Sequence, residues 1–174
     1  MEEIEVKILE VNRPKIEKIL EALGAEKVFD GEVETAFFDF KDARIGKAKN
    51  VLRLRQENDK AELTYKKIQF TQTAKTAQEY TVEVSNLETA KKILGSLELF
   101  ETQNMKKHRV SYTLDDARFD FDRYEGAYGY IPEFLEIEAK SAEAIYRYAG
   151  LLGFEEKDCL PWSTTELLGH YSSK

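Results

Sequence analysis

Short segments in which charged and apolar residues alternate recur along the chain, and they constrain its fold more than any other feature. The first is Glu3-Ile4-Glu5-Val6-Lys7. In a β-strand, successive side chains point to opposite faces, so its three charged residues share one face and its aliphatic residues share the other. Taken alone, this segment is typical of an amphipathic strand with its charged face in water. The same alternation recurs on later segments, and this recurrence argues against placing every charged face in solvent.

Six further segments show the same alternation. They are Val51–Arg55, Glu62–Lys66, Glu79–Val84, Lys107–Tyr112, Arg118–Asp122 and Phe134–Lys140. Their polar faces, with that of the first segment, carry the carboxylates Glu3, Glu5, Glu62, Glu79, Glu83, Asp120, Asp122, Glu136 and Glu138 and the cations Lys7, Arg53, Arg55, Lys66, Lys107, Arg109 and Arg118. The opposite faces carry aliphatic and aromatic residues, which other elements must cover.

Amphipathic helices are the available cover for these apolar faces. Asn12, Asn86 and Ser141 are good N-caps, and apolar residues follow each of them at helical spacing. The sequence therefore predicts helices over residues 12–23, 86–97 and 141–152, and a capping box at 163–166 predicts a short fourth one. Residues 41–50 and 69–78 lack periodicity and are expected to form loops, the second of them a candidate lid.

An open sheet with its charged face in solvent is one fold that fits this pattern. Two features favour a closed sheet instead. Arg and Glu dominate the strand centres, where a solvent-facing sheet would carry more Thr, Ser and Gln, and about eight strands need their edges protected. We therefore expect an α+β fold: a closed antiparallel β-barrel of about eight strands, with a charged tunnel inside and several helices outside. No linker divides the chain, so a single domain over residues 1–174 is expected.

Composition excludes several classes of protein. No apolar run approaches the roughly 20 residues that a membrane-spanning helix needs, and the acidic start argues against a secretory signal. The single cysteine, Cys159, fits a reducing cytoplasm. A net charge of -7 argues against a general nucleic-acid-binding protein. We expect a cytoplasmic protein that binds neither membranes nor nucleic acids; a homodimer is compatible with the sequence but not required by it.

The mixture of charges inside such a barrel indicates a ligand. Clustered carboxylates bind hard divalent cations such as Mg²⁺ or Mn²⁺, and arginine and lysine bind phosphate oxygens. Together they suit a metal-bound polyphosphate or nucleoside triphosphate, although the chain has no P-loop and no CxxC or HExxH motif. His108 falls on an apolar face and is interpreted as structural.

The charged segments resemble the CYTH superfamily, the triphosphate tunnel metalloenzymes. Glu3-Ile4-Glu5-Val6-Lys7 is similar to its ExExK signature, and the later charged strands follow it in the family's order. The length and the closing 163–169 segment, STTELLG, are most similar to the class IV adenylyl cyclase branch.

The resemblance implies a role for each charged residue. Mg²⁺ or Mn²⁺ would be held by Glu3, Glu5, Asp122, Glu136 and Glu138. Phosphate would be bound by Lys7, Arg53, Arg55, Lys66, Lys107 and Arg109, with Glu5, Lys7 and Arg109 as the catalytic candidates and Glu79, Glu83, Asp120 and Arg118 in support. The implied partner is a small-molecule triphosphate.

Three functions remain open at this point. The resemblance implies an enzyme, either a cyclase that converts ATP to cyclic AMP and pyrophosphate or a triphosphatase that hydrolyses tripolyphosphate, thiamine triphosphate or nucleoside triphosphates. The same site would also serve a non-catalytic triphosphate-binding protein. The third possible function is an interaction module. Its charged face would be solvated, and the aromatic segment Tyr124–Tyr130 would make the contact.

Overall fold

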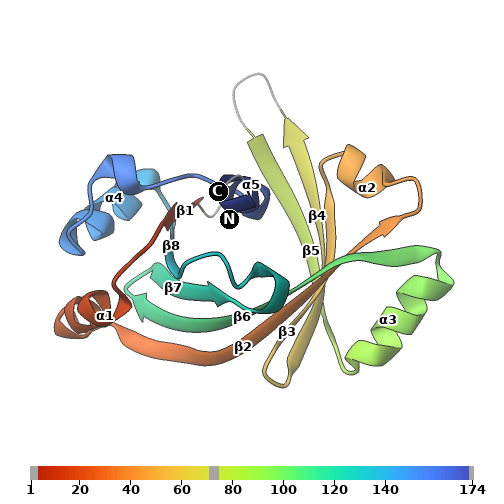
Figure 1. Ribbon diagram of the computed structural model, residues 1–174, viewed down its shortest axis with the longest axis horizontal. Helices are drawn as coiled ribbons and strands as arrows, with labels where there is room; N and C mark the ends of the chain where they lie inside the picture. The colour runs from red at the N-terminus through yellow and green to blue at the C-terminus, as the bar shows by residue number, and fades with distance from the viewer. Residues whose placement is uncertain (1–3, 71–74, 173–174) are drawn as a thin grey trace. The chain divides into compact units, whose positions relative to one another are not determined.

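The computed structural model of the protein describes residues 4–70 and 75–172 (Figure 1). Its strands are β1 (Ile4–Ile8), β2 (Glu26–Phe40), β3 (Val51–Glu57), β4 (Lys60–Phe70), β5 (Lys75–Val84), β6 (Leu99–Leu114), β7 (Ala117–Tyr124) and β8 (Phe134–Ala139). Its helices are α1 (Arg13–Ala22), α2 (Arg44–Lys47), α3 (Leu87–Ser96), α4 (Ala142–Leu151) and α5 (Thr164–Ser172), with 3-10 turns at Gly126–Tyr128 and Glu156–Asp158. None of the described helices has the length and apolar composition to cross a bilayer.

The strands form one antiparallel sheet in the order β1-β8-β7-β6-β2-β3-β4-β5. This confirms the predicted α+β class. The order found for the described residues begins at β1 and ends at β5, so the closed barrel is not confirmed. The chain divides into two compact units, Met1–Gly31 with Lys107–Lys174, and Glu32–Lys106; β2 and β6 contribute to both.

In the first unit, the predicted apolar faces form the core under α1 and α4. Val6 and Ile8 of β1 join Phe119, Phe121 and Ile137, each at most 5% exposed. Burying a side chain of this size contributes about 1.5–3 kcal/mol. The predicted N-caps are present: the Asn12 side chain accepts a hydrogen bond from the Lys15 N–H group, and Ser141 accepts one from Ala144.

The second unit has a smaller core beneath α3. Ala36 and Phe38 of β2 and Leu54 of β3 pack with Ala90 and Leu94 of α3. Asn86 caps this helix as predicted, accepting a hydrogen bond from the Thr89 N–H group. Because side chains alternate on β3, Leu54 points into the core and Arg53 and Arg55 lie on the other face.

Both predicted loops in this unit need correction. Residues 44–47 of the first form α2, because the Asp39 carboxylate binds the backbone N–H groups of Ile45 and Gly46. The second was predicted over residues 69–78, but β4 continues to Phe70 and β5 begins at Lys75, with those two residues paired. Residues 71–74, the centre of the candidate lid, lie outside the described residues.

Candidate functional site

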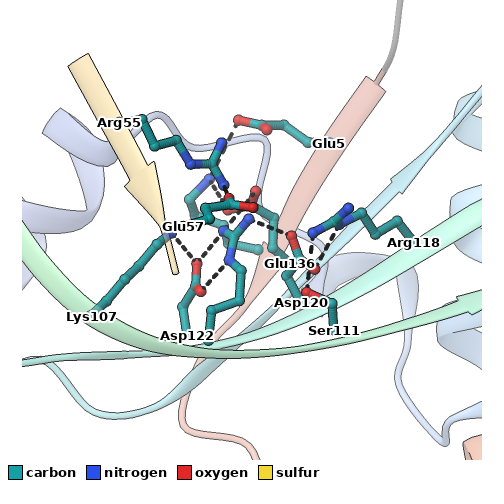
Figure 2. Close-up of polar contacts among 11 residues, drawn as sticks. Glu5, Arg55, Glu57, Lys107, Ser111, Arg118, Asp120, Asp122 and Glu136 are labelled. Atoms are coloured by element: carbon teal, nitrogen blue, oxygen red, sulfur yellow. Dashed lines mark hydrogen bonds and ion pairs between the residues drawn. The ribbon is translucent and has the colours of Figure 1, made fainter. Parts of the chain in front are cut away.

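A buried cluster of opposite charges lies on the polar face of the first unit (Figure 2). Strand register creates it, because Arg109 of β6 lies opposite Asp122 of β7. Glu136 of β8 lies opposite Asp120 on one side and Lys7 of β1 on the other. Four neighbouring strands thus contribute charged side chains to one face, as the alternation predicted.

Asp122 is the acceptor at the centre of this cluster. Its side chain is fully buried, and Figure 2 shows Lys107 pointing toward it. The Arg109 guanidinium donates two hydrogen bonds of 2.6 Å to its two oxygens, and the Lys107 ammonium donates one of 2.5 Å. Burial alone would raise the pKa of Asp122, but Lys107 and Arg109 outweigh burial and hold that pKa well below its usual range. The carboxylate is therefore ionised at neutral pH.

The two lysines of the cluster respond differently to burial. Burial alone would lower the pKa of Lys7, but its Nζ lies 3.1 Å from Glu136 and 3.5 Å from Glu5, and these carboxylates raise that pKa. For Lys107, burial and the neighbouring Arg109 lower the pKa, and the carboxylates of Asp122 and Glu136 offset them only in part. Burial likewise opposes the ionised form of Glu136, yet Lys7 and Lys107 lower its pKa. Lys7 and Glu136 thus stabilise each other in the charged form.

The carboxylates of β1 and β8 provide oxygen ligands of the kind that Mg²⁺ and Mn²⁺ prefer. Glu5 lies directly opposite Glu138, and like charges in that position repel unless a cation neutralises them. The Glu5 side chain is 53% exposed and can turn toward an ion. Among residues 4–70 and 75–172, however, no three Asp, Glu, His or Cys side chains are gathered for metal binding. The donor chemistry fits a divalent ion, but lysine Nζ atoms hold some of the same oxygens.

The second unit has a polar face of its own. Arg53 and Arg55 of β3 lie opposite Thr64 and Glu62 of β4. The other polar-face residues are Lys66 of β4 and Glu79, Thr81 and Glu83 of β5. Lys66 lies 2.5 Å from Glu79, and Arg55 forms an ion pair with Glu57. Burial alone would raise the pKa of Glu79, but Lys66, together with Arg53 and Arg55, outweighs burial and lowers that pKa. Three predicted phosphate-binding cations, Arg53, Arg55 and Lys66, therefore share one face.

Residues 1–145 match the family described as the CYTH domain. The chain belongs to the CYTH family. This match covers most of the 174 residues and confirms the resemblance inferred from the charged strands.

The chain is also similar to one named protein and to two solved structures. A protein of Methanocaldococcus jannaschii named "Putative adenylate cyclase" is 27% identical over 138 residues, which are 79% of this chain and 77% of that protein. The structure of PH1012 protein from Pyrococcus horikoshii has a TM-score of 0.74 at 29% identity, covering 95% of this chain and 98% of the other. A conserved hypothetical protein from Pyrococcus furiosus has a TM-score of 0.73 at 26% identity, covering 95% and 99%.

Most of the site residues predicted in the first unit lie together in the charged cluster. Those brought together are Lys7, Lys107, Arg109, Asp120, Asp122 and Glu136, with Glu5 beside Lys7 and Arg118 bound to Asp120. Glu3 lies outside the described residues. His108 lies between Lys107 and Arg109 on β6, so it is on the other face of that strand, with its Nε2 atom 3.2 Å from Asp30.

Tyr124 is a buried residue of the polar face that the sequence did not identify as part of the site. Tyr124 follows Asp120 and Asp122 at the same two-residue spacing on β7, and it is 7% exposed. The alternation that identified the two aspartates could have found it. The sequence instead placed it in the aromatic segment Tyr124–Tyr130 and assigned that segment to surface contact, which does not fit a side chain as buried as that of Tyr124.

Proposed function

We propose that this CYTH protein is a metal-dependent enzyme that binds the triphosphate of a nucleotide or polyphosphate on the polar face of its sheet. The observation that carries the proposal is the array of cations in the first unit, the buried Lys7 and Arg109 and the half-buried Lys107, each oriented by a carboxylate of a neighbouring strand. Cations already fixed in place need little reorganisation when an anion binds, which makes them effective at stabilising charge.

Each group of residues has a separate role in this proposal. Lys7, Lys107 and Arg109 in the first unit, and Arg53, Arg55 and Lys66 in the second, bind phosphate oxygens. Arginine suits this role because its planar donors bind two oxygens at once. The buried Asp122 keeps Arg109 and Lys107 charged and correctly directed before substrate arrives. Lys7 and Arg109 then neutralise negative charge that develops on the phosphate during the reaction.

The divalent ion has a defined set of candidate ligands. Glu5, Glu136 and Glu138, with Glu3, are the residues that would hold Mg²⁺ or Mn²⁺. Asp122, also predicted as a ligand, would join them only by releasing Arg109 or Lys107. When bound, such an ion supplies Lewis-acid stabilisation of charge on the phosphate oxygens. The closed barrel with its charged tunnel and a cytoplasmic location belong to the same proposal.

Cyclisation of ATP is the first candidate reaction. The name of the Methanocaldococcus jannaschii relative favours it, as does the similarity of the closing STTELLG segment to class IV adenylyl cyclases. The ribose 3′-hydroxyl would attack the α-phosphate, and pyrophosphate would leave. Hydrolysis of a triphosphate is the second candidate, because the charged groups of the cluster are suited to phosphate whatever is attached to it. In that case water would attack the terminal phosphate.

Product analysis tests these alternatives. The protein is incubated with ATP, tripolyphosphate and thiamine triphosphate in the presence of Mg²⁺ or Mn²⁺, and the products are separated by chromatography. Cyclic AMP with pyrophosphate identifies a cyclase, and orthophosphate identifies a triphosphatase. Calorimetric binding without any product would instead identify a triphosphate-binding protein. Neither product nor binding, from folded protein, would overturn the proposal.

A variant at Glu5 tests the metal role directly. Glu5→Gln removes a charge from a half-exposed side chain, so turnover should be lost while tripolyphosphate binding in metal-free buffer is retained. Glu143→Gln, at an exposed position of α4, is the matched control and should keep full turnover. Unchanged turnover of Glu5→Gln would exclude Glu5 as a metal ligand.

A further inference from the structure

The ring of Tyr124 lies beside the ammonium group of Lys107. The two residues are opposite each other on β6 and β7, and the Lys107 Nζ is 5.8 Å from the centre of the ring. A cation at this distance is attracted to the electron-rich face of an aromatic ring, and the attraction is stronger where water is excluded. Lys107 is therefore held by two groups, the Asp122 carboxylate and the Tyr124 ring.

Tyr124 is itself fixed by the packing around it. Its ring packs against Phe134, with centroids 6.0 Å apart, and against Tyr128 at 6.3 Å. Its hydroxyl group lies near the side chain of Thr164, the first residue of α5, which lowers the pKa of Tyr124 that burial raises. A buried tyrosine whose ring is packed between two other aromatic rings has little freedom to turn away from Lys107.

The helix that supplies Thr164 is firmly attached to the first unit. Leu167 of α5 is fully buried, and the Tyr171 hydroxyl donates a 3.0 Å hydrogen bond to Glu10. The start of the helix is closed by a capping box in which the Ser163 N–H and hydroxyl groups donate to Glu166. Thr164 is thus a fixed point from which Tyr124 can be oriented.

The segment before α5 also contacts β1, the strand of Lys7, which is the other lysine of the cluster. The backbone N–H of Lys7 donates to the Leu160 carbonyl at 2.8 Å, and the Leu160 N–H donates back at 2.9 Å. Leu160 and Thr164 both lie beyond the 1–145 match to the CYTH family. Residues 160–172 therefore support Lys7 through its backbone and Lys107 through Tyr124.

We propose that Tyr124 is a positioning residue for phosphate binding: it holds the Lys107 ammonium in place, and Thr164 of α5 holds Tyr124. This inference rests on the proposed function, because Lys107 must bind phosphate for its position to matter. A lysine side chain loses considerable rotational freedom on binding. Fixing it in advance therefore removes part of the cost of binding an anion.

A double-mutant cycle tests whether Tyr124 acts through Lys107. Tripolyphosphate binding is measured by calorimetry, with EDTA present, for wild type, Tyr124→Leu, Lys107→Met and the double variant. Loss of the ring should weaken binding about tenfold, and the double variant should bind no more weakly than Lys107→Met. Losses that multiply in the double variant overturn the inference and leave the proposed function intact. A wild-type chain that binds no tripolyphosphate overturns both.

Conservative variants test the connection to α5 without disturbing the core. Thr164→Ser keeps the hydroxyl group and should bind as wild type, whereas Thr164→Val should weaken binding about threefold. Tyr124→Phe keeps the ring and should lose the same factor, with no further loss when combined with Thr164→Val. Equal binding by Thr164→Ser and Thr164→Val would overturn the role of α5.

Lysine labelling gives a readout that does not depend on substrate. Wild type and Tyr124→Leu are treated briefly with acetic anhydride, and acetylation of Lys107 is quantified by mass spectrometry against the exposed Lys140 as internal control. Release of Lys107 from the ring should increase its labelling severalfold. Unchanged labelling of Lys107 in a folded Tyr124→Leu protein would contradict the proposed contact.

Discussion

Arg109 and Asp122 face each other across two neighbouring strands and form a two-point ion pair. The Arg109 Nε and Nη2 atoms each lie 2.6 Å from a different oxygen of Asp122. The two side chains are 7% and 0% exposed. Burying both charges costs solvation free energy, which the contact offsets only while both partners are present.

The first prediction concerns the loss of one partner. Asp122→Asn leaves Arg109 and Lys107 buried without their central carboxylate, so the free energy of unfolding should fall by about 3–5 kcal/mol. Urea denaturation measures this change. Asp116→Asn, which removes an exposed partner of Lys140, should have little effect because exposed ion pairs contribute little. Equal losses of unfolding free energy in the two variants would show that the buried ion pair contributes no more to stability than an exposed one.

The second prediction follows from the pKa of Glu136, which lies below its ordinary value because Lys7 and Lys107 outweigh the effect of burial. A carboxyl group with a lowered pKa stabilises the fold above the pKa of the unfolded chain, near 4. That stability is lost as the pH falls through the folded-state pKa. Thermal unfolding should show Glu136→Gln to be less stable than wild type at pH 7, with a difference that shrinks below about pH 4. A difference that stays constant from pH 7 to pH 3 would contradict it.

The third prediction concerns the polar face of the second unit. Arg53→Met removes a cation from β3, so tripolyphosphate should bind 10- to 100-fold more weakly, roughly the loss of one charge-assisted contact. The remaining affinity should also depend less steeply on salt. Calorimetry at two salt concentrations measures both effects. Arg44→Met, at an exposed position of α2, is the control; a loss as large as that of Arg53→Met would indicate general electrostatic attraction rather than a specific contact.

The sequence predicted the faces of the strands better than their arrangement. Alternation correctly separated Val6 and Ile8, which are buried in the core, from Lys7 on the polar face. A period of two residues is a local property, so it can be recognised within one strand. Closure of the sheet depends on partners far apart in the chain, and the sequence pattern does not specify those pairings.

Alternation could not reveal two features of the site: the residues that contact it from distant segments, and the partners of its charged groups. Thr164 lies near the hydroxyl group of Tyr124, and Leu160 forms a backbone bridge to Lys7 of β1. Nothing in the local sequence of either residue indicates those partners. The sequence also did not show which charged groups pair with one another. The sequence indicated Asp122 as a metal ligand, whereas in the structure its oxygens are bound by Arg109 and Lys107. Only the cross-strand register reveals that competition.

The last prediction concerns Asp39, whose importance the sequence did not indicate. This carboxylate is 8% exposed and accepts hydrogen bonds from the backbone N–H groups of Phe40 at 2.7 Å, Ile45 at 3.0 Å and Gly46 at 2.8 Å. Asp39→Ala leaves these donors without their acceptor, so the free energy of unfolding should fall by about 3 kcal/mol. Asp39→Asn keeps one acceptor oxygen and should lose less.

Two companion variants make this test specific to Asp39. Asp42→Ala removes an exposed carboxylate that accepts one longer bond, of 3.3 Å, from Arg44, and should have little effect on urea denaturation. Gly46→Ala would place a methyl group 3.2 Å from the Asp39 carboxylate and should destabilise the same contact by crowding. Because both changes act on one contact, the loss in Asp39→Ala/Gly46→Ala should be smaller than the sum of the single losses. Additive losses would mean that the carboxylate does not hold α2 through Gly46.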